Sequence, residues 1–349
     1  MINLLDMTCE EVTSYIISQN EPKFRGKQIY SWLYKGISSF EDMLNIPKSL
    51  REKLTENCTL GQLEIAEKFV SDIDETRKYL LQLNDGNYIE TVLMKYHHGY
   101  TLCVSSQVGC RMGCKFCAST LNGKVRDLTP GEIIGQILAV QNDLGERISN
   151  IVMMGIGEPL DNYDNVMKFL EIVSSPEGLN IGMRHISLST CGLVPKIYEL
   201  ADEKLQITLS ISLHATDDKM RSSIMPVNNK YNIEKLIDAC RYYIEKTNRR
   251  ISFEYTLISG VNDNIETADA LIKLLSGMLC HVNLIPVNAV SETGFKKTDR
   301  KKVEAFQARL EKNGISATIR REMGSDISAA CGQLRNKKTQ SERMDINGN

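Results

Sequence analysis

Residues 108–120, VGCRMGCKFCAST, place three cysteines within eight positions. Cys110, Cys114 and Cys117 follow the spacing C-x3-C-x2-C. A disulfide needs two thiols and a closed tetrahedral zinc site needs four ligands, yet no fourth Cys or His lies at the usual zinc-finger spacing. Three thiolates can hold three irons of a 4Fe–4S cubane and leave the fourth iron open. The segment predicts such a cluster, and zinc is the less favoured alternative.

The open iron of this cluster can bind a ligand that offers an amino and a carboxylate group. S-adenosylmethionine (SAM) offers both, and one electron from the reduced cluster can cleave its sulfonium to a 5′-deoxyadenosyl radical. We therefore predict one 4Fe–4S cluster with three Cys ligands and with SAM at the fourth position.

Strand-like and helix-like runs alternate on the C-terminal side of residue 100. This order predicts parallel βαβ units, in a doubly wound sheet or in a full or partial β/α barrel. The strand-like runs are 100–107, 149–155, 184–190, 205–213, 250–258, 281–287 and 315–321, and the helix-like runs between them include 130–145, 232–246, 264–279 and 299–314.

The N-terminal part has a different pattern. Residues 1–62 predict a small helical accessory domain, and residues 63–95 predict a β-hairpin linker around Asn84-Asp85-Gly86, a strong turn signal. We expect the core barrel to span 96–322. The segment 323–349 follows it and ends in a polar tail, which we expect to be disordered.

Composition limits the function classes. The chain has 349 residues, of which 42% are hydrophobic and 25% charged. No apolar run approaches the roughly 20 residues of a membrane span, and no secretory signal is readable, so we expect a cytoplasmic protein without membrane contact. Residues 1–90 carry a net charge of −5, whereas 219–250 and 288–349 carry +5 each. Solvated helix faces or an anionic partner such as RNA would explain the basic segments equally well.

Polar residues follow several of the predicted strands. Four groups of residues occupy such places. They are the turn Gly155-Ile156-Gly157-Glu158-Pro159, Ser189, the run Ser212-Leu213-His214, and Asn288. Each alone has an ordinary structural role, such as a tight turn or a core histidine. Because the C-terminal ends of parallel strands meet on one face, together they predict one site beside the cysteine loop.

The chain resembles the radical SAM enzymes. More narrowly, it resembles the bacterial adenine carbon-2 RNA methyltransferases, the RlmN family, close relatives of the carbon-8 methylase Cfr. The resemblance implies a partial β/α (TIM-like) barrel and methyl transfer to an adenosine of 23S rRNA in the peptidyl-transferase centre, with the adenosine 3′ of the tRNA anticodon as a second target. The motifs that carry it are FRGKQIYSWLYKG (24–36), IETV (89–92), LCVSSQVGCRMGCKFCAST (102–120), GIGEPLDNYDNV (155–166), LSTCGLVP (188–195), SLHATDDKMRSSIMPVN (212–228), ISGVND (258–263), NLIPVN (283–288) and DISAACGQL (326–334).

The resemblance also assigns catalytic roles. Carbon 2 of adenine has no lone pair that could attack the methyl group of SAM, so simple displacement fails. In the family, the cysteine matching Cys331 takes a methyl group from one SAM, and the adenosyl radical from a second SAM activates it, so that a transient RNA–protein crosslink forms. Cys103 matches the thiol that releases the product through a transient disulfide, and Glu90 matches the general base. Without the resemblance, Cys331 would be taken for a core residue and Glu90 for a solvated one.

The expected SAM contacts come from the same resemblance. They are Gly157, Glu158, Ser189, Ser212, Leu213, His214 and Asn288. The Gly-Glu turn would hold the methionine amino group, and the serines and Asn288 would hold the carboxylate and ribose. No role is assigned to Cys9, Cys58, Cys191, Cys240 and Cys280, of which Cys191 lies nearest a predicted strand end.

The implied partners are unassembled or assembling 23S rRNA, tRNA, and an external one-electron reductant such as flavodoxin or ferredoxin. We expect a monomer, whose second N-terminal helix offers the basic residues Arg25, Lys27 and Lys35 to RNA. Two alternatives stay open. One is a Cfr-like carbon-8 methylase that confers antibiotic resistance, and the other is a non-catalytic iron–sulfur protein.

Overall fold

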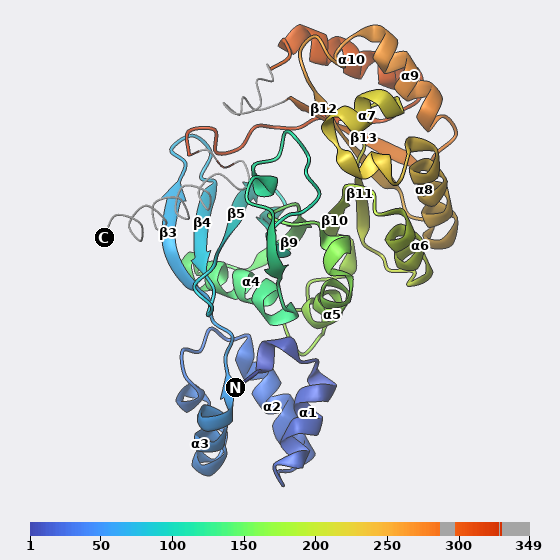
Figure 1. Ribbon diagram of the computed structural model, residues 1–349. Coiled ribbons are helices and arrows are strands. Elements are labelled where there is room, and N and C mark those ends of the chain that lie inside the picture. Colours follow the sequence, from blue (N-terminus) through green and yellow to red (C-terminus); the bar gives the residue numbers. More distant parts are fainter. Residues whose placement is uncertain (287–296, 328, 330–349) are drawn as a thin grey trace.

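A ten-stranded sheet forms the centre of the computed structural model, which describes residues 1–286, 297–327 and 329 (Figure 1). Its strand order is β14-β13-β12-β11-β10-β9-β6-β5-β4-β3. The parallel part runs from β6 to β14. Its strands are β6 (Gly99–Cys103), β9 (Ile148–Met153), β10 (Ile186–Thr190), β11 (Thr208–Ser212), β12 (Ile251–Leu257), β13 (Cys280–Pro286) and β14 (Ala317–Ile319).

Helices connect the parallel strands, and all of them except α7 (Asp218–Ile224), which packs beside the cysteine loop, cover one face of the sheet. They are α4 (Pro130–Leu144), α5 (Tyr163–Ser174), α6 (Val194–Asp202), α7 (Asp218–Ile224), α8 (Ile233–Thr247), α9 (Ile265–Leu275) and α10 (Arg300–Lys312). Within the described residues the edge strands β14 and β3 do not pair with each other, so the sheet stays open. This confirms the predicted partial β/α architecture.

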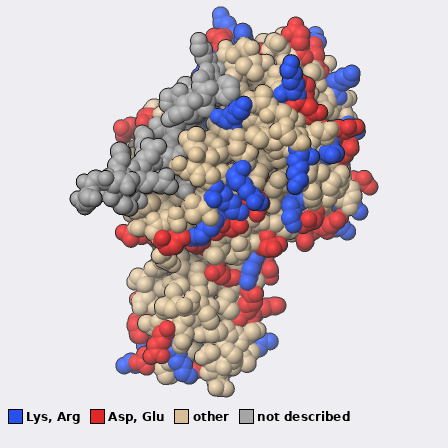
Figure 2. All heavy atoms as spheres, viewed as in Figure 1, with Lys and Arg blue, Asp and Glu red and all other residues tan. Residues whose placement is uncertain are grey.

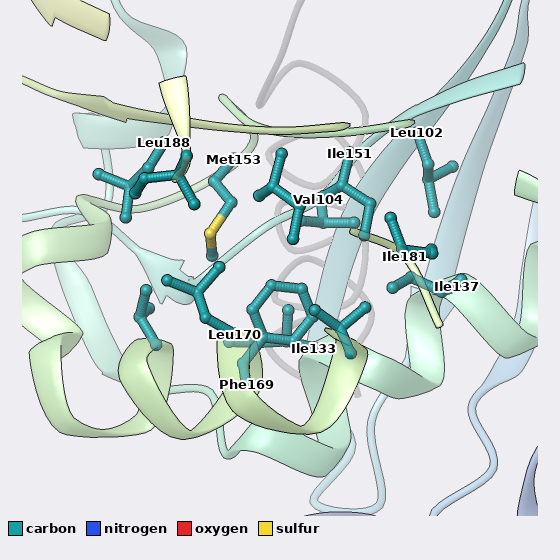
Figure 3. Packing of buried hydrophobic residues seen from close by; sticks show 14 of the residues in the cluster. Leu102, Val104, Ile133, Ile137, Ile151, Met153, Phe169, Leu170, Ile181 and Leu188 are labelled. Carbon is teal, nitrogen blue, oxygen red and sulfur yellow. The ribbon is translucent and has the colours of Figure 1, made fainter. Parts of the chain in front are cut away.

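The main core lies between the parallel strands and these helices (Figure 3). Ile151 and Met153 of β9 are buried against this layer, to which α5 contributes Phe169. Each such side chain contributes roughly 1.5–3 kcal/mol when fully buried. Because side chains alternate along a strand, Val152 belongs to the opposite, inner face of the sheet. One face of the sheet therefore packs against the helices and stabilises the fold, and the inner face can carry the residues of a functional site.

An antiparallel extension continues the sheet from β6. It consists of β3 (Glu64–Val70), β4 (Arg77–Gln82) and β5 (Tyr88–Tyr96). The predicted hairpin turn lies between β4 and β5, where Gly86 has φ +81° and Leu83 N donates to Asn87 O. The hairpin is confirmed, and its strands are continuous with the core sheet. The domain boundaries themselves remain a prediction.

The N-terminal residues form α1 (Cys9–Ser18), α2 (Lys23–Leu33) and α3 (Lys48–Asn57), together with the short parallel pair β1 (Ile2–Asn3) and β2 (Cys58–Thr59). These helices lie together below the core (Figure 1). Asp6 accepts the Gly131 N–H at the start of α4, and Lys168 of α5 pairs with Glu11 at 2.8 Å. These contacts attach the helical part to the outer side of the core.

Charge is unevenly distributed over the surface. On the face seen in Figure 2, Lys and Arg side chains gather over the core above the N-terminal helices. No helix in the described part of the chain is long and apolar enough to cross a membrane.

Candidate active site

The cysteine loop lies between two short antiparallel strands, β7 (Gln107–Gly109) and β8 (Lys124–Asp127). These strands close the loop at its base, where Cys110 N donates to Gly123 O at 3.1 Å. Inside the loop, the Thr120 hydroxyl donates to the carbonyls of Cys114 and Cys117. The loop leads into α4, whose first turn is fixed by a capping box formed by Thr129 and Glu132.

Cys110, Cys114 and Cys117 line one cavity of about 280 Å³. Burial, together with the charges of neighbouring thiols, raises the pKa of Cys110 to about 12 and also raises that of Cys114. Thiols held this close together ionise only when cations compensate their charge, and iron does this. In a cubane each thiolate binds a different iron, so the donor set fits a 4Fe–4S cluster. Among the described residues no three His, Cys, Asp or Glu side chains are grouped closely enough for a single metal ion.

The turn after β9 also lines this cavity. Gly155 and Gly157 permit close backbone contacts, since a Cβ on Gly155 would lie 2.6 Å from Val104 O and one on Gly157 would lie 2.6 Å from Gln107 Cβ. Gly157 also has φ +110°, which disfavours any other residue. The turn is held because Gln107 Oε1 accepts the N–H of Glu158 at 2.9 Å. Glycine is therefore required at both positions.

The Glu158 carboxylate is buried, and 4% of the residue is exposed. It accepts hydrogen bonds from the backbone N–H of Leu160 at 3.1 Å and of Cys191 at 2.7 Å. No Lys, Arg or His in the described part of the chain forms an ion pair with it. Burial raises its pKa. This carboxylate can bind a cationic group such as the ammonium of an amino acid.

His214 follows β11 in a left-handed conformation, with φ +57°. Its Nδ1 accepts the Thr256 N–H at 3.0 Å, so the proton of the neutral ring lies on Nε2. Burial and the nearby charge of Arg221 lower its pKa to about 3. The ring meets Phe116 of the cysteine loop edge to face, with centroids 4.9 Å apart. His214 therefore remains a neutral hydrogen-bond donor at the cavity wall.

Arg221 of α7 connects the two loops that follow β10 and β11. It is fully buried and donates to the carbonyls of Cys191 at 2.7 Å, Ser212 at 3.0 Å and Leu213 at 3.1 Å. These bonds fix the backbone beside Ser189 and His214. Cys191, which the sequence left without a role, lies in this wall.

A second group of predicted residues lies on the inner face of the sheet. The strand register aligns Lys78 of β4, Val92 of β5, Cys103 of β6 and Val152 of β9 in one row. Residues directly opposite one another share a face, and Glu90 lies two positions from Val92 on the same strand. Glu90, Cys103 and Lys78 therefore point to one side of the sheet. Glu90 forms an ion pair with Lys78 at 2.9 Å, with 2% and 0% of the side chains exposed.

The structure thus places most of the predicted site residues in two neighbouring groups. One cavity is lined by the three cysteines together with Gly157, Glu158, Ser189, Ser212 and His214. Leu213 is buried next to that cavity. Glu90 and Cys103 lie on the inner face of β5 and β6, whereas Asn288 and Cys331 lie outside the described residues.

Sequence reasoning missed Lys78, Arg221, Glu254 and Arg320. Glu254 is buried in β12, where it accepts a hydrogen bond from Asn283 at 2.7 Å, and it lines the same cavity as Arg320. Burial raises its pKa, and Arg320 opposes this. A carboxylate inside the apolar run 250–258 was the signal that could have found it.

Comparisons with known proteins define the class. Residues 104–272 match the model of the radical SAM superfamily, and residues 2–60 match that of the ribosomal RNA large subunit methyltransferase N-terminal domain. A radical SAM methyltransferase from Sphaerobacter thermophilus has a similar structure, with a TM-score of 0.91 and 43% identity over 95% of this chain and 99% of that one. The fold is that of a radical SAM methyltransferase.

Curated relatives narrow this class further. The probable dual-specificity RNA methyltransferase RlmN of Clostridium botulinum (strain Eklund 17B / Type B) is 59% identical over 98% of this chain and 99% of its own length. The protein with the same description from Clostridium perfringens (strain SM101 / Type A) is 59% identical over 99% of this chain and 100% of its own length. The chain belongs to the RlmN family of RNA methyltransferases.

Proposed function

We propose that this protein methylates carbon 2 of an adenosine in the peptidyl-transferase centre of 23S rRNA and of the adenosine 3′ of the anticodon in tRNA, in the cytoplasm. The observation that carries the proposal is the cavity lined by the three cysteines and by the Gly157-Glu158 turn, together with an inner sheet face that bears Glu90 and Cys103. The words "dual-specificity RNA methyltransferase" in the relatives' names support two RNA substrates. The substrate rRNA would be unassembled or assembling, and the enzyme a monomer.

Cys110, Cys114 and Cys117 would hold the 4Fe–4S cluster, and Glu158 would bind the amino group of SAM. Ser189, Ser212, Leu213, His214 and Asn288 would contact the rest of SAM. When bound, the cluster and SAM supply a 5′-deoxyadenosyl radical after one electron arrives from a reductant such as flavodoxin or ferredoxin. The buried walls around His214 and Glu158 would exclude water from this chemistry.

Cys331 would carry the methyl group. One of the two SAM molecules used per turnover would donate this methyl group to the Cys331 sulfur. The described residues before it support a position at the inner face. Ala329 packs against the cluster of Val92, Met94 and Cys103. Cys331 follows Ala329 by two residues, a span of at most about 7 Å between their Cα atoms, so the proposed disulfide with Cys103 requires no long reach of the chain.

The start of this C-terminal segment is anchored to the turn between β3 and β4. The Asp326 carboxylate accepts from the Ser71 hydroxyl at 2.7 Å and from the Asp72 N–H at 2.9 Å. Asp74 in turn accepts the Gly324 N–H at 2.8 Å. The segment that leads to Cys331 is therefore tied beside the strand that carries Lys78.

Glu90 would take the proton from carbon 2 of the base after the Cys331 methylene radical has bonded to it. The adduct would also give up one electron, for which the iron–sulfur cluster that was oxidised in SAM cleavage would be the acceptor, so that a closed-shell thioether remains. Attack of the Cys103 sulfur on the Cys331 sulfur would then form a disulfide and break the bond between sulfur and the methylene carbon. The methylene carbon would keep the electron pair of that bond and take up one proton, so that a methyl group remains on the base. The shared face of Glu90 and Cys103 supports this sequence.

Anaerobic reconstitution with iron and sulfide, followed by SAM, dithionite and unmodified rRNA and tRNA transcripts, tests the proposal. We expect 5′-deoxyadenosine to form and mass spectrometry of the nucleosides to show 2-methyladenosine from both RNA classes. A Cys103→Ala variant should accumulate a protein–RNA crosslink, and its absence would contradict the role of this thiol. Finding 8-methyladenosine would favour the Cfr-like alternative, and failure to cleave SAM would favour a non-catalytic iron–sulfur protein.

A further inference from the structure

A second cavity adjoins the candidate active site. It is a groove of about 450 Å³ on the inner face of the sheet, and it is lined by residues of β5, β9, β10, β13 and β14. Met154 and Arg320 line both this groove and the cavity of the three cysteines. Val152 and Met94 also line it, and they belong to the apolar cluster that contains Cys103. The groove therefore leads to the place where methyl transfer is proposed.

The groove is strongly cationic. Three arginines, Arg184, Arg320 and Arg321, line it, and its lining includes no Asp or Glu among the described residues. All three are exposed, and Arg184 and Arg321 form no ion pair with a described residue, whereas Arg320 shares the neighbouring cavity with the Glu254 carboxylate. A guanidinium without a carboxylate partner can bind the two oxygens of a phosphate in a bidentate manner. The groove is therefore suited to a polyanion.

The groove also offers an aromatic surface. The rings of Tyr96 and His98 are stacked, with centroids 5.2 Å apart and an interplanar angle of 6°. Both residues line the groove, and His98 is exposed. Proteins that bind single-stranded nucleic acid combine cationic grooves with such flat side chains, on which bases stack. An acidic peptide would use the arginines but would leave the aromatic pair without a function.

We propose that this groove binds the RNA strand next to the target nucleotide, with Arg184 and Arg321 on backbone phosphates and the Tyr96–His98 pair against a neighbouring base. This inference rests on the proposed function only in requiring an RNA substrate, and it is independent of which carbon is methylated. A base unstacked from RNA held here would enter the adjoining cavity. The N-terminal helices would then bind more distant parts of the RNA.

The test is a double variant, Arg184→Gln/Arg321→Gln, which leaves Arg320 and the active-site cavity intact. The matched control is Lys235→Gln/Arg241→Gln on α8, where both side chains are exposed and lack ion pairs with described residues. The probe is a short fluorescein-labelled single-stranded RNA. We expect the groove variant to bind it about tenfold or more weakly, and the slope of log K against log salt concentration to shrink by about 1.4, since each phosphate contact contributes about 0.7. The control should match wild type.

Further measurements distinguish RNA binding in the groove from misfolding and from binding of an acidic peptide. SAM cleavage without RNA should be unchanged in the groove variant, and Arg184→Lys/Arg321→Lys should restore most of the salt slope. If wild type methylates RNA while the groove variant keeps its affinity and slope, the groove proposal is overturned and the proposed function survives. A wild-type protein that binds no RNA would overturn both. Greater loss of affinity for an oligoglutamate peptide than for RNA would also overturn the proposal.

Discussion

Two buried glutamates illustrate how differently the two halves of the sheet are built. Glu158 lies in the parallel half, after β9, and Glu90 lies in the antiparallel extension, in β5. Both residues are at most 4% exposed. Glu158 is held by backbone N–H groups of Leu160 and Cys191, whereas Glu90 forms an ion pair with Lys78 at 2.9 Å.

The difference follows from the geometry of each half. Side chains on one face of adjacent antiparallel strands lie next to each other, so a carboxylate in β5 can form an ion pair with an ammonium group from β4. The loops after parallel strands instead direct backbone amides and short side chains toward a common cavity. The parallel half is built to receive charged groups of a ligand, and the extension supplies its own counter-charge.

Lys78→Met should have the largest effect on stability. It removes the ammonium from a carboxylate that stays buried, and breaking such a pair costs about 3–5 kcal/mol. We expect a clear fall in the thermal midpoint. The double variant Lys78→Met/Glu90→Gln should recover at least half of this loss, because no ionised group is then left without its partner.

The matched control is the ion pair between Lys95 and Glu75 in the same extension, which is 2.6 Å long but largely exposed. Lys95→Met should barely change the midpoint, since solvent screens such pairs. Equal effects of Lys78→Met and Lys95→Met would contradict the comparison between buried and exposed charge.

Local sequence patterns predicted the parallel half better than the extension. The spacing of Cys110, Cys114 and Cys117 and the glycines of the 155–159 turn are local features, and strand order alone brings them to one face. The Lys78–Glu90 pair depends on the register that sets Leu80 opposite Glu90. A turn motif shows that a hairpin forms but leaves this register open.

Long-range contacts could not be predicted from the local sequence either. Arg221 bonds to carbonyls from two different loops, 8 to 30 residues away in the chain. An arginine in a polar motif gives no sign of such burial. The same holds for the groove, whose arginines come from segments more than 100 residues apart and meet only in the folded sheet.

Glu158→Gln should have a smaller effect, and of a different kind. Glu158→Gln removes a buried charge, but it replaces one of the two oxygens that accept the Leu160 and Cys191 N–H groups with an NH2 that cannot accept, so the thermal midpoint should fall slightly. SAM binding, in contrast, should weaken about 30-fold, which corresponds to about 2 kcal/mol for a lost charge-assisted hydrogen bond. Isothermal titration calorimetry of the anaerobically reconstituted protein measures this. Glu158→Asp serves as the control that keeps the charge, and unchanged SAM affinity in Glu158→Gln would contradict the assigned contact.

The acid response of His214 should be the smallest effect, and it tests whether the parallel half holds this ring as a neutral hydrogen-bond donor. Burial holds its pKa at about 3 in the folded protein, whereas the unfolded chain takes up a proton near pH 6.5. The unfolded state therefore binds more protons between these values, and stability falls as pH drops from about 6.5 toward 3. At pH 5.5 the loss is about 1.4 kcal/mol. Thermal midpoints of wild type should consequently decline more between pH 8 and 5.5 than those of His214→Gln, and parallel curves for the two proteins would show that this ring is not buried in its neutral form.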